Sequence, residues 1–400
     1  MKKIYSFTLL LCFIFGISDS NAQTQYAWVQ KAKFGGVARH RASGASCGNR
    51  GYMGLGHYNS VAPDVLFQDW WEYDPGTDTW TQKANFGGGL RYHCAAFTIG
   101  NFIYIGTGRA PNSVLMNDFW KYDVVNNTWS PIANFPGAAR RGAVAFAING
   151  FGYVGTGSYY ADFYKYDPVA NQWTAVAPLP ASGRISAVAF MINNKGYVGT
   201  GDVGGPSGDL WEYNPTTNSW TAKANLPGLP RMEATGFALN GKGYIGTGDN
   251  FSSGTNYQDF WCFDPASNTW LQVADFAGAA RRYLCSFTIG NRAYAGTGTS
   301  GINYDDFWEY GTISDITELN EQVDINVYPN PATENVTFSF SKQLNNALFF
   351  LYDSGGKMLS REQFSGTRFL MNRENLAAGV YFYSITSEEQ YVSNGKIVLQ

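Results

Sequence analysis

One template occurs six times between Arg39 and Tyr310, and it constrains the fold more than any other feature of this sequence. In each copy an Arg is followed thirteen residues later by a Tyr that opens the pattern Tyr-x-Gly-(Thr/Leu)-Gly, and then by a mostly aromatic stretch that begins with Asp. Gly-rich, aromatic-rich repeats of 44 to 52 residues indicate a circular array of small antiparallel sheets. We therefore expect an all-β chain built around a six-bladed β-propeller. The template pairs are Arg39 and Tyr52, Arg91 and Tyr104, Arg140 and Tyr153, Arg184 and Tyr197, Arg231 and Tyr244, and Arg281 and Tyr294.

The third copy shows the four strands that we expect in each blade. Residues 143–148 alternate small and large side chains, which is the period of a strand, and a turn at Asn149-Gly150 leads to a second strand at 152–155. The third and fourth strands are predicted at 162–166 and 172–176. The large side chains of the first strand can pack against the small side chains of the next blade.

The position of Trp28 predicts how the ring closes. A Trp lies eleven residues before each template Arg, and Trp28 is the one that precedes Arg39. The last copy, which ends near Tyr310, has no such Trp after it. Residues 26–32 should therefore supply the fourth strand of the sixth blade, which removes exposed sheet edges. The other Trp residues of this set are Trp80, Trp129, Trp173, Trp220 and Trp270.

The N-terminus reads as an export signal. Lys2 and Lys3 precede an apolar run at 7–17 and the small-residue end Ser20-Asn21-Ala22, so residues 1–22 are predicted to be a signal peptide. The run is shorter than a membrane span needs, and we expect no transmembrane segment in the mature chain. A net charge of −3 gives no basic field for nucleic acid.

The remaining cysteines lack the spacing of a metal or disulfide framework. We expect buried thiols, although an exported chain could pair two of them. They are Cys47, Cys94, Cys262 and Cys285.

Loop lengths indicate which face carries function. Only the distance from the template Tyr to the next Asp varies, from nine residues after Tyr153 to seventeen after Tyr52. That loop joins the second and third strands, and its start lies beside the beginning of the first strand. Variable loops on a rigid scaffold are the usual place for binding, so we assign the site to this face.

Polar and aromatic side chains cluster at the loop ends of this face. Arg can bind carboxylates and Tyr can stack on sugars, so these residues suit an anionic or polyhydroxylated ligand; a solvated rim is the alternative. The six template Arg are expected to be structural and to bond loop carbonyls. The three histidines could hold copper or zinc if they converged, but no metal or other cofactor is predicted. The candidates are His40, Arg41, His57, Tyr92, His93, Arg109, Arg141, Asp202, Glu233, Asp249, Arg282 and Tyr283.

Three features of each copy carry a resemblance: the turn glycines, the aromatic strand, and the Trp eleven residues after the Asp that begins this strand. Through them, residues 26–310 resemble the kelch repeats of galactose-oxidase-like propellers. Kelch units commonly have adjacent glycines after the Tyr strand, whereas here a residue separates them, as in Gly106-Thr107-Gly108. The resemblance implies a ligand site on the same face. We favour a module that binds glycan or protein over an enzyme. The alternative is a sugar oxidase or a sialic acid epimerase, for which Glu233 with Arg141 or Arg282 is the suggestive set.

A second domain follows a change in composition after Gly311. We expect a propeller at 23–312, a linker at 313–323 and a small β-sandwich at 324–400, with strands at 335–340, 347–352, 379–383 and 395–398. This block resembles the C-terminal sorting domain of type IX secretion. The resemblance implies passage across the outer membrane to a secreted or surface-attached state, with the type IX machinery as a partner. Separately, we expect the propeller to be a monomer. The residues that carry it are Tyr328, Pro329, Asn330, Pro331, Gly379, Tyr381 and Lys396.

Overall fold

The structure is a computed structural model of the chain. It describes residues 26–58, 65–251, 255–312, 324–354, 357–373, 375–387 and 390–400. The predicted signal peptide and the predicted linker lie outside these residues. The chain divides into two compact units, Met1–Ile313 and Ser314–Gln400, and each is described by itself.

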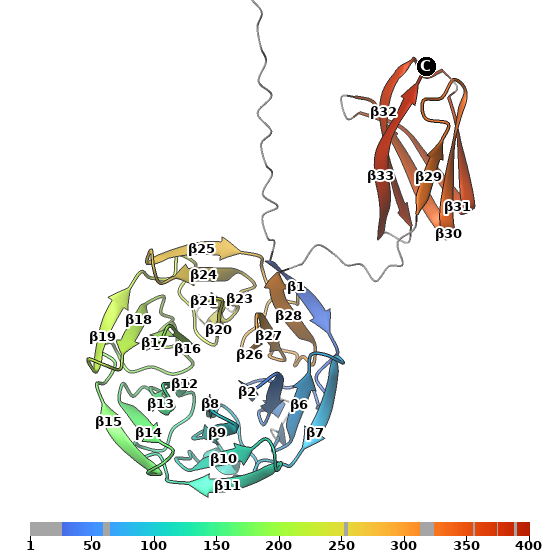
Figure 1. Cartoon of the computed structure of the whole chain (residues 1–400). Helices are drawn as coiled ribbons and strands as arrows, with labels where there is room; N and C mark the ends of the chain where they lie inside the picture. The colour runs from blue at the N-terminus through green and yellow to red at the C-terminus, as the bar shows by residue number, and fades with distance from the viewer. Residues whose placement is uncertain are drawn as a thin grey trace, which may run out of the picture. The chain divides into compact units, whose positions relative to one another are not determined.

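The first unit is a ring of six antiparallel sheets of four strands each (Figure 1). Two short hairpins extend its loops: β4 (His57–Tyr58) with β5 (Val65–Leu66), and β22 (Asp249–Asn250) with β23 (Thr255–Asn256). The 3-10 turn η1 is Pro111–Ser113. Across the part of the chain that is described, no helix is long and apolar enough to cross a membrane.

The blades are numbered along the chain, and in each blade the strands run from the axis outward in the order given. Blade 1 has β2 (Ser43–Cys47), β3 (Arg50–Gly54), β6 (Trp70–Asp74) and β7 (Thr79–Lys83). Blade 2 has β8 (Ala95–Ile99), β9 (Phe102–Gly106), β10 (Phe119–Asp123) and β11 (Thr128–Ile132). Blade 3 has β12 (Val144–Ile148), β13 (Phe151–Gly155), β14 (Phe163–Asp167) and β15 (Gln172–Val176).

The second half of the ring repeats this order. Blade 4 has β16 (Val188–Ile192), β17 (Lys195–Gly199), β18 (Leu210–Asn214) and β19 (Ser219–Lys223). Blade 5 has β20 (Thr235–Leu239), β21 (Lys242–Gly246), β24 (Phe260–Asp264) and β25 (Thr269–Val273). Blade 6 has β26 (Cys285–Ile289), β27 (Arg292–Gly296), β28 (Phe307–Thr312) and β1 (Tyr26–Lys31).

The ring closes through its N-terminal strand, as the position of Trp28 predicted. β1 pairs antiparallel with β28, and Trp28 lies opposite Tyr310. In blade 1, Trp80 lies opposite Tyr73 in the same way. The strand that begins the described chain is therefore the fourth strand of the blade that ends the ring.

Neighbouring blades pack large side chains against glycines. The Phe146 ring of blade 3 lies on Gly196 of blade 4, where a Cβ would be 2.4 Å from the ring. Both residues are on inner strands, so any larger side chain at Gly196 would push the blades apart. This is the packing of a large face on a small face that the alternation in the first strands predicted.

The four cysteines of the propeller are free thiols. Cys47, Cys262 and Cys285 are buried, and burial raises the pKa of Cys94 and of Cys285 to about 12. These thiols stay protonated at neutral pH and pack as small apolar side chains. No disulfide forms between these described residues.

The template arginines are structural. Arg140 is fully buried; its Nη2 donates to Asp162 at 2.8 Å and its Nη1 donates to the Thr156 carbonyl at 2.8 Å. The fork therefore joins the start of the third strand to the residue between the two glycines of Gly-x-Gly. The other five pairs repeat this geometry: Arg39 with Asp69, Arg91 with Asp118, Arg184 with Asp209, Arg231 with Asp259, and Arg281 with Asp306.

The second unit is a sheet of five strands that folds on itself. Its strands are β29 (Ile325–Tyr328), β30 (Asn335–Tyr352), β31 (Met358–Asn372), β32 (Gly379–Ser387) and β33 (Gln390–Leu399). Phe338 and Phe349 lie on β30 with ring centroids 5.1 Å apart, although eleven residues of straight strand would span about 36 Å. β30 therefore doubles back, and its two halves enclose one core with Tyr383.

Two details of this unit differ from the sequence analysis. The strands predicted at 335–340 and 347–352 are the two halves of β30, and β31 was missed. Polar residues between the halves suggested a loop, but the backbone stays extended through a bend with irregular register.

The three motif segments of the second unit lie together. The side chain of Asn330 donates to the carbonyl of Lys396 at 3.0 Å and accepts from the N–H of Val398 at 2.9 Å. β32, which carries Tyr381, pairs with β33 next to it. The Tyr-Pro-Asn-Pro segment is thus hydrogen-bonded to the last strand, a contact that links residues far apart in sequence.

Replacing Trp173 by Ala should lower the free energy of unfolding of the propeller by about 3 kcal/mol. The indole packs on Phe119 and Phe135 at 5.0 and 5.4 Å between centroids, and its N–H donates to the Ala133 carbonyl of blade 2 at 2.9 Å. Urea denaturation followed by Trp fluorescence measures the change. The control is Val169→Ala, since Val169 is 95% exposed; equal stability of the two variants would contradict the packing described.

Candidate functional site

One backbone position per blade surrounds the axis, two residues after each template Arg. All six residues have left-handed φ between 53° and 64°, which is unfavourable for every residue but Gly. They precede the innermost strands, so their side chains gather where the six blades meet. We call this set the axial ring: Arg41, His93, Gly142, Ser186, Glu233 and Tyr283.

Backbone hydrogen bonds between blades hold the axial ring in this conformation. In five of the six, the N–H donates to the carbonyl of the axial residue of the preceding blade, at 2.8 to 3.2 Å. Donor and acceptor are His93 and Arg41, Gly142 and His93, Ser186 and Gly142, Glu233 and Ser186, and Tyr283 and Glu233. The strained left-handed backbone persists because these hydrogen bonds satisfy backbone N–H and carbonyl groups of neighbouring axial residues.

Arg41 is the hub of the cluster at the axis. Its Nη1 donates to Nε2 of His40 at 3.0 Å and to Nε2 of His57 at 2.8 Å, and its Nη2 donates to the Tyr283 hydroxyl. The guanidinium also lies 3.7 Å from the centroid of the Tyr283 ring and 3.9 Å from Glu233 Oε1. One cation thus links side chains from three blades.

The two histidines beside Arg41 are neutral. A guanidinium can only donate, so Nε2 of both rings must be unprotonated, and Nδ1 of His40 donates to Asn303 at 2.6 Å. Burial and the charge of Arg41 lower the pKa of His40 to about 3; burial, His40 and Arg41 lower that of His57 to about 2. The Nε2 lone pairs that a metal would need are engaged by Arg41. No group of three or more metal-binding side chains occurs among the described residues.

A chain of acidic and basic groups continues from Arg41 across the axis. Glu233 Oε2 lies 3.1 Å from Arg282 Nε, and Arg282 Nη1 donates to Asp249 at 2.5 Å. Burial raises the pKa of Glu233 to about 7, with a contribution from Asp249 that Arg41 and Arg282 oppose. Burial also raises the pKa of Asp249. Glu233 can therefore exchange a proton near neutral pH, where an ordinary Glu is fully ionised.

Aromatic rings flank the cluster on both sides. His57 stacks on Tyr92 with centroids 4.0 Å apart, and the Arg109 guanidinium lies 6.0 Å from the centroid of the Tyr92 ring. On the other side, a hollow of about 410 Å³ opens beside Glu233 and is edged by the exposed rings of Tyr159 and Phe251. The Tyr159 hydroxyl donates to Asp202 at the floor of this hollow, at 2.5 Å.

Arg141 is a cation of this face whose guanidinium has no partner among the described residues; Arg109, which also lacks an acidic partner, bonds to the Ser113 hydroxyl. Within the described part of the chain, its guanidinium forms no hydrogen bond and no ion pair. Its charge is close enough to contribute to the lowered pKa of His57 and of His93. Arg41 and Arg282, by contrast, are both paired with Glu233.

The sequence candidates fall into one connected cluster and its neighbours. The connected cluster, which we call the axial cluster, is His40, Arg41, His57, Glu233, Asp249, Arg282 and Tyr283. Tyr92 and Arg109 stack beside it, and Asp202 borders the hollow. His93 lies 3.3 Å from the Ser186 hydroxyl, and its ring meets the cluster at Tyr283, with centroids 5.5 Å apart. The three histidines do not meet at one point.

Sequence reasoning missed several members of this face. Ser186 and Gly142 belong to the axial ring, and reading every residue two positions after a template Arg would have found both. Tyr159 and Phe251 lie in the variable loops, where no repeat marks their position. Asn303 holds His40 from another blade, and only the closed ring brings them together.

The pH dependence of stability should report the buried histidines. Their pKa is about 6.5 in the unfolded chain and far lower in the fold, so the unfolded state gains protons first and stability falls as pH drops below about 6.5. Glu233 opposes this, because its raised pKa adds stability that is lost as pH rises toward 7, and the raised pKa of Asp249 acts in the same direction. His40, His57 and His93 outnumber these two carboxyl groups, and each net proton contributes about 1.4 kcal/mol per pH unit.

Urea denaturation between pH 7.5 and 5 measures this slope. His57→Gln should reduce this slope by the contribution of one proton, about 1.4 kcal/mol per pH unit. The Gln side-chain oxygen can still accept a hydrogen bond from Arg41. A stability that stays flat over this range would mean that the histidines are solvated, contrary to their burial here.

Comparisons with known proteins agree with this architecture. The KLHDC2/KLHL20/DRC7 Kelch-repeats domain matches residues 90–230 and 150–298, and the Secretion system C-terminal sorting domain matches residues 326–400. Among solved structures, the one titled "Structure of YjhT" has a TM-score of 0.60 and 18% identity, and the match covers 71% of this chain and 98% of that chain. No curated protein matches the sequence significantly.

The two family matches divide the chain in the same way as its two compact units. The kelch match spans more than half of the sequence, and the sorting-domain match covers the C-terminal unit, which indicates export by type IX secretion. The chain therefore belongs to the kelch-repeat family and carries a C-terminal secretion sorting domain.

Proposed function

We propose that the exported propeller is a binding module that holds a glycan with an anionic group at the axial cluster. The observation that carries this proposal is Arg141, a cation on the variable face without an acidic partner among the described residues. Arg guanidinium groups bind carboxylates and phosphates through two parallel hydrogen bonds. A ligand anion would pair with Arg141 as Glu233 and Asp249 pair with Arg41 and Arg282.

The charges of the face support an anionic ligand. This face carries four arginines and three carboxyl groups. One carboxyl group, that of Glu233, is partly protonated at neutral pH. The arginines are Arg41, Arg109, Arg141 and Arg282, and the carboxyl groups are Asp202, Glu233 and Asp249. The buried histidines are neutral and add nothing. The face therefore keeps a net positive charge although the whole chain is acidic.

Exposed aromatic rings support a sugar as the body of the ligand. Tyr159 and Phe251 are 55% and 67% exposed beside the hollow at Glu233, which is unusual for rings of this size. Sugars stack their C–H faces on such rings while their hydroxyls bond to carboxylates such as Asp202. We also propose that no metal is needed, since Arg41 engages both nearby imidazoles, and that the propeller acts as a monomer.

A catalytic function is the second candidate, and Glu233 favours it. A carboxyl with a pKa of about 7 can give and take a proton at neutral pH, as isomerisation of a sugar requires. Arg282 and Arg41 on either side could stabilise negative charge that develops on the substrate. The sorting domain fits either function, with the protein released or held at the outer surface.

Ligand-observed NMR of the mature chain, residues 23–400, tests the proposal with hexoses, uronic acids and sialic acid. Uronic or sialic acid should bind, and Arg141→Ala should weaken binding at least about tenfold through loss of a charge-assisted hydrogen bond. Binding should survive EDTA. Arg50→Ala is the matched control, because Arg50 pairs with Asp74 at the other end of blade 1.

Each outcome separates the candidate functions. Saturation transfer without change in the sugar supports a binding module. A new product or faster exchange between anomers, lost in Glu233→Gln, supports the enzyme. Absence of binding by every sugar would contradict the proposal and leave a protein ligand as the candidate.

A further inference from the structure

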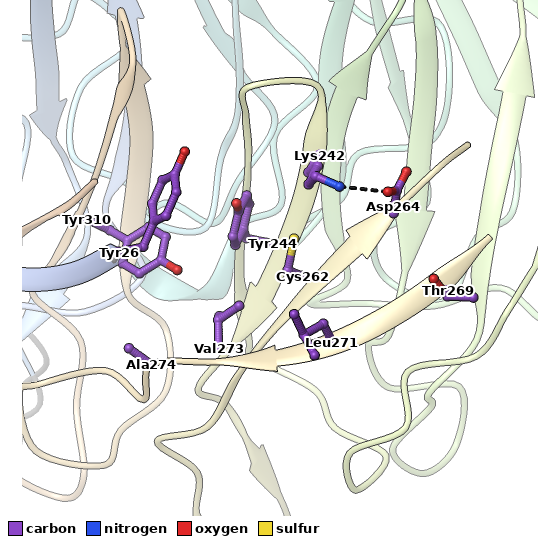
Figure 2. A pocket seen from close by; sticks show the side chains of 10 residues that line it. All are labelled: Tyr26, Lys242, Tyr244, Cys262, Asp264, Thr269, Leu271, Val273, Ala274 and Tyr310. Carbon is purple, nitrogen blue, oxygen red and sulfur yellow. Dashed lines mark hydrogen bonds and ion pairs between the residues drawn. The ribbon is translucent and has the colours of Figure 1, made fainter. Parts of the chain in front are cut away.

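A groove of about 720 Å³ lies at the seam between blades 5 and 6, far from the axial ring along the strands. Its residue Asp264 ends β24, whereas the template partner Asp259 precedes the start of that strand. Figure 2 shows Tyr26, Tyr310 and Ala274 on one side of the groove and the Lys242–Asp264 ion pair on the other. The other five seams show what normally occupies this position.

At each of those seams, a turn side chain closes the contact between blades. An Asp or Asn, four residues after the end of the third strand, accepts a hydrogen bond from the backbone N–H of an alanine in the preceding blade. The pairs are Ala32 with Asp78 (3.0 Å), Ala84 with Asn127 (2.8 Å), Ala133 with Asn171 (2.9 Å), Ala177 with Asn218 (2.9 Å) and Ala224 with Asn268 (3.0 Å).

Two more hydrogen bonds complete these seams. In blades 1 to 4 a Tyr hydroxyl of the third strand donates to the same acceptor side chain, at 2.7 to 2.8 Å, as Tyr73 does to Asp78. At all five seams the Trp of the fourth strand donates its indole N–H to the carbonyl of the alanine, as Trp220 does to Ala177 at 2.9 Å.

The sixth seam has the three donor groups but lacks the Asp or Asn side chain. The equivalent residues are Ala274, Tyr310 and Trp28, and none of them donates at this seam to any described residue. The Trp28 indole nitrogen is buried without a partner. Ala274 is exposed, whereas its five counterparts are half-buried. A buried donor without an acceptor is costly, so this seam is incomplete.

The cause is the break in the ring. Trp28 belongs to the N-terminal strand, and Tyr26 stands two residues before it, where the other blades have the Asp or Asn. The Tyr26 hydroxyl accepts instead from the Asn240 side chain at 2.9 Å. The groove is also widened because Cys262 stands where the other third strands have a long charged residue, namely Glu72, Lys121, Lys165, Glu212 and Glu309.

We propose that the groove is the docking site for the start of the connector after β28, with Asp315 as its hydrogen-bond acceptor. Tyr310 aligns with Tyr73, because each lies opposite the Trp of its blade, and Asp315 follows Tyr310 by five residues as Asp78 follows Tyr73. Asp315 lies outside the described residues, so its register comes from the sequence. Asp78 in blade 1 is a carboxylate in the same role.

The docked carboxylate accepts from the Ala274 N–H and the Tyr310 hydroxyl. The connector then supplies the turn that the chain break removed from blade 6, and both ends of the propeller are tied to blade 5. This role is independent of what the axial cluster binds.

Disulfide trapping in the mature chain tests the docking directly. Ala274→Cys with Asp315→Cys should crosslink on mild oxidation, at least about tenfold faster than Ala274→Cys with Glu318→Cys, because disulfides form only between close Cα atoms. Ala224→Cys with Asn268→Cys, at a complete seam, is the benchmark. Peptide mapping by mass spectrometry separates these bonds from the four native thiols. The proposal is overturned if the Asp315→Cys variant forms its disulfide no faster than the Glu318→Cys variant.

A second measurement covers failure of the cysteine variants to fold or crosslink. Asp315→Ala should lower the thermal midpoint by about 2 to 4 °C and speed alkylation of Cys262, which lines the groove. Asp315→Asn should resemble the wild type, since Asn serves at four seams. Identical midpoints and alkylation rates for Asp315→Ala and the wild type would overturn the proposal.

Discussion

The buried pair between a template Arg and the Asp of the third strand is the interaction on which the rest of the propeller depends. Replacing such a pair by apolar residues is often neutral, whereas breaking it costs about 3 to 5 kcal/mol. Its value here is geometric. The Arg140 guanidinium binds Asp162 and the Thr156 carbonyl at once, so the two ends of the loop between the second and third strands are held together. Loop length can then vary without disturbing the ring.

The backbone of the same arginines joins the blades. The second Gly of each Gly-x-Gly donates its N–H to the carbonyl of the template Arg in the next blade, at 2.7 to 3.0 Å, and the six bonds form a closed ring. A residue two positions later is thereby held in a left-handed conformation at the axis. Because backbone hydrogen bonds maintain this conformation, the side chain at this position can differ between blades. The equivalent residues include Arg41, Glu233 and Tyr283.

Much of the fold could be read from spacing alone. The constant distances from Arg to Tyr and from Trp to Arg predicted the blades, and Trp28 predicted the closure, because these distances act within one repeat. The single variable loop predicted which face carries the binding site, and that assignment stays a prediction. The functional assignment of the candidate residues remains a prediction.

Contacts across the axis could not be predicted. Arg41 meets Glu233 and Tyr283 from blades more than 190 residues away, and that meeting depends on the radius of the ring and on rotamers. The folding back of β30 was missed for a related reason: polar residues at its bend look like a loop. For Asp315, the spacing within the repeat can be read from the sequence, whereas its proposed hydrogen-bond partners are inferred from the other five seams.

Carbon-13 NMR titration of Glu233 tests the account of the axial cluster most directly. Glutamate labelled at the carboxyl carbon, with Glu233→Gln to assign the signal, reports the pKa of this one group in the mature chain. The cluster described here predicts a pKa of about 7, because burial outweighs the two arginines. A value near 4.5, the ordinary one for Glu, would mean that water reaches the carboxylate and that the six blades do not gather their axial side chains as described.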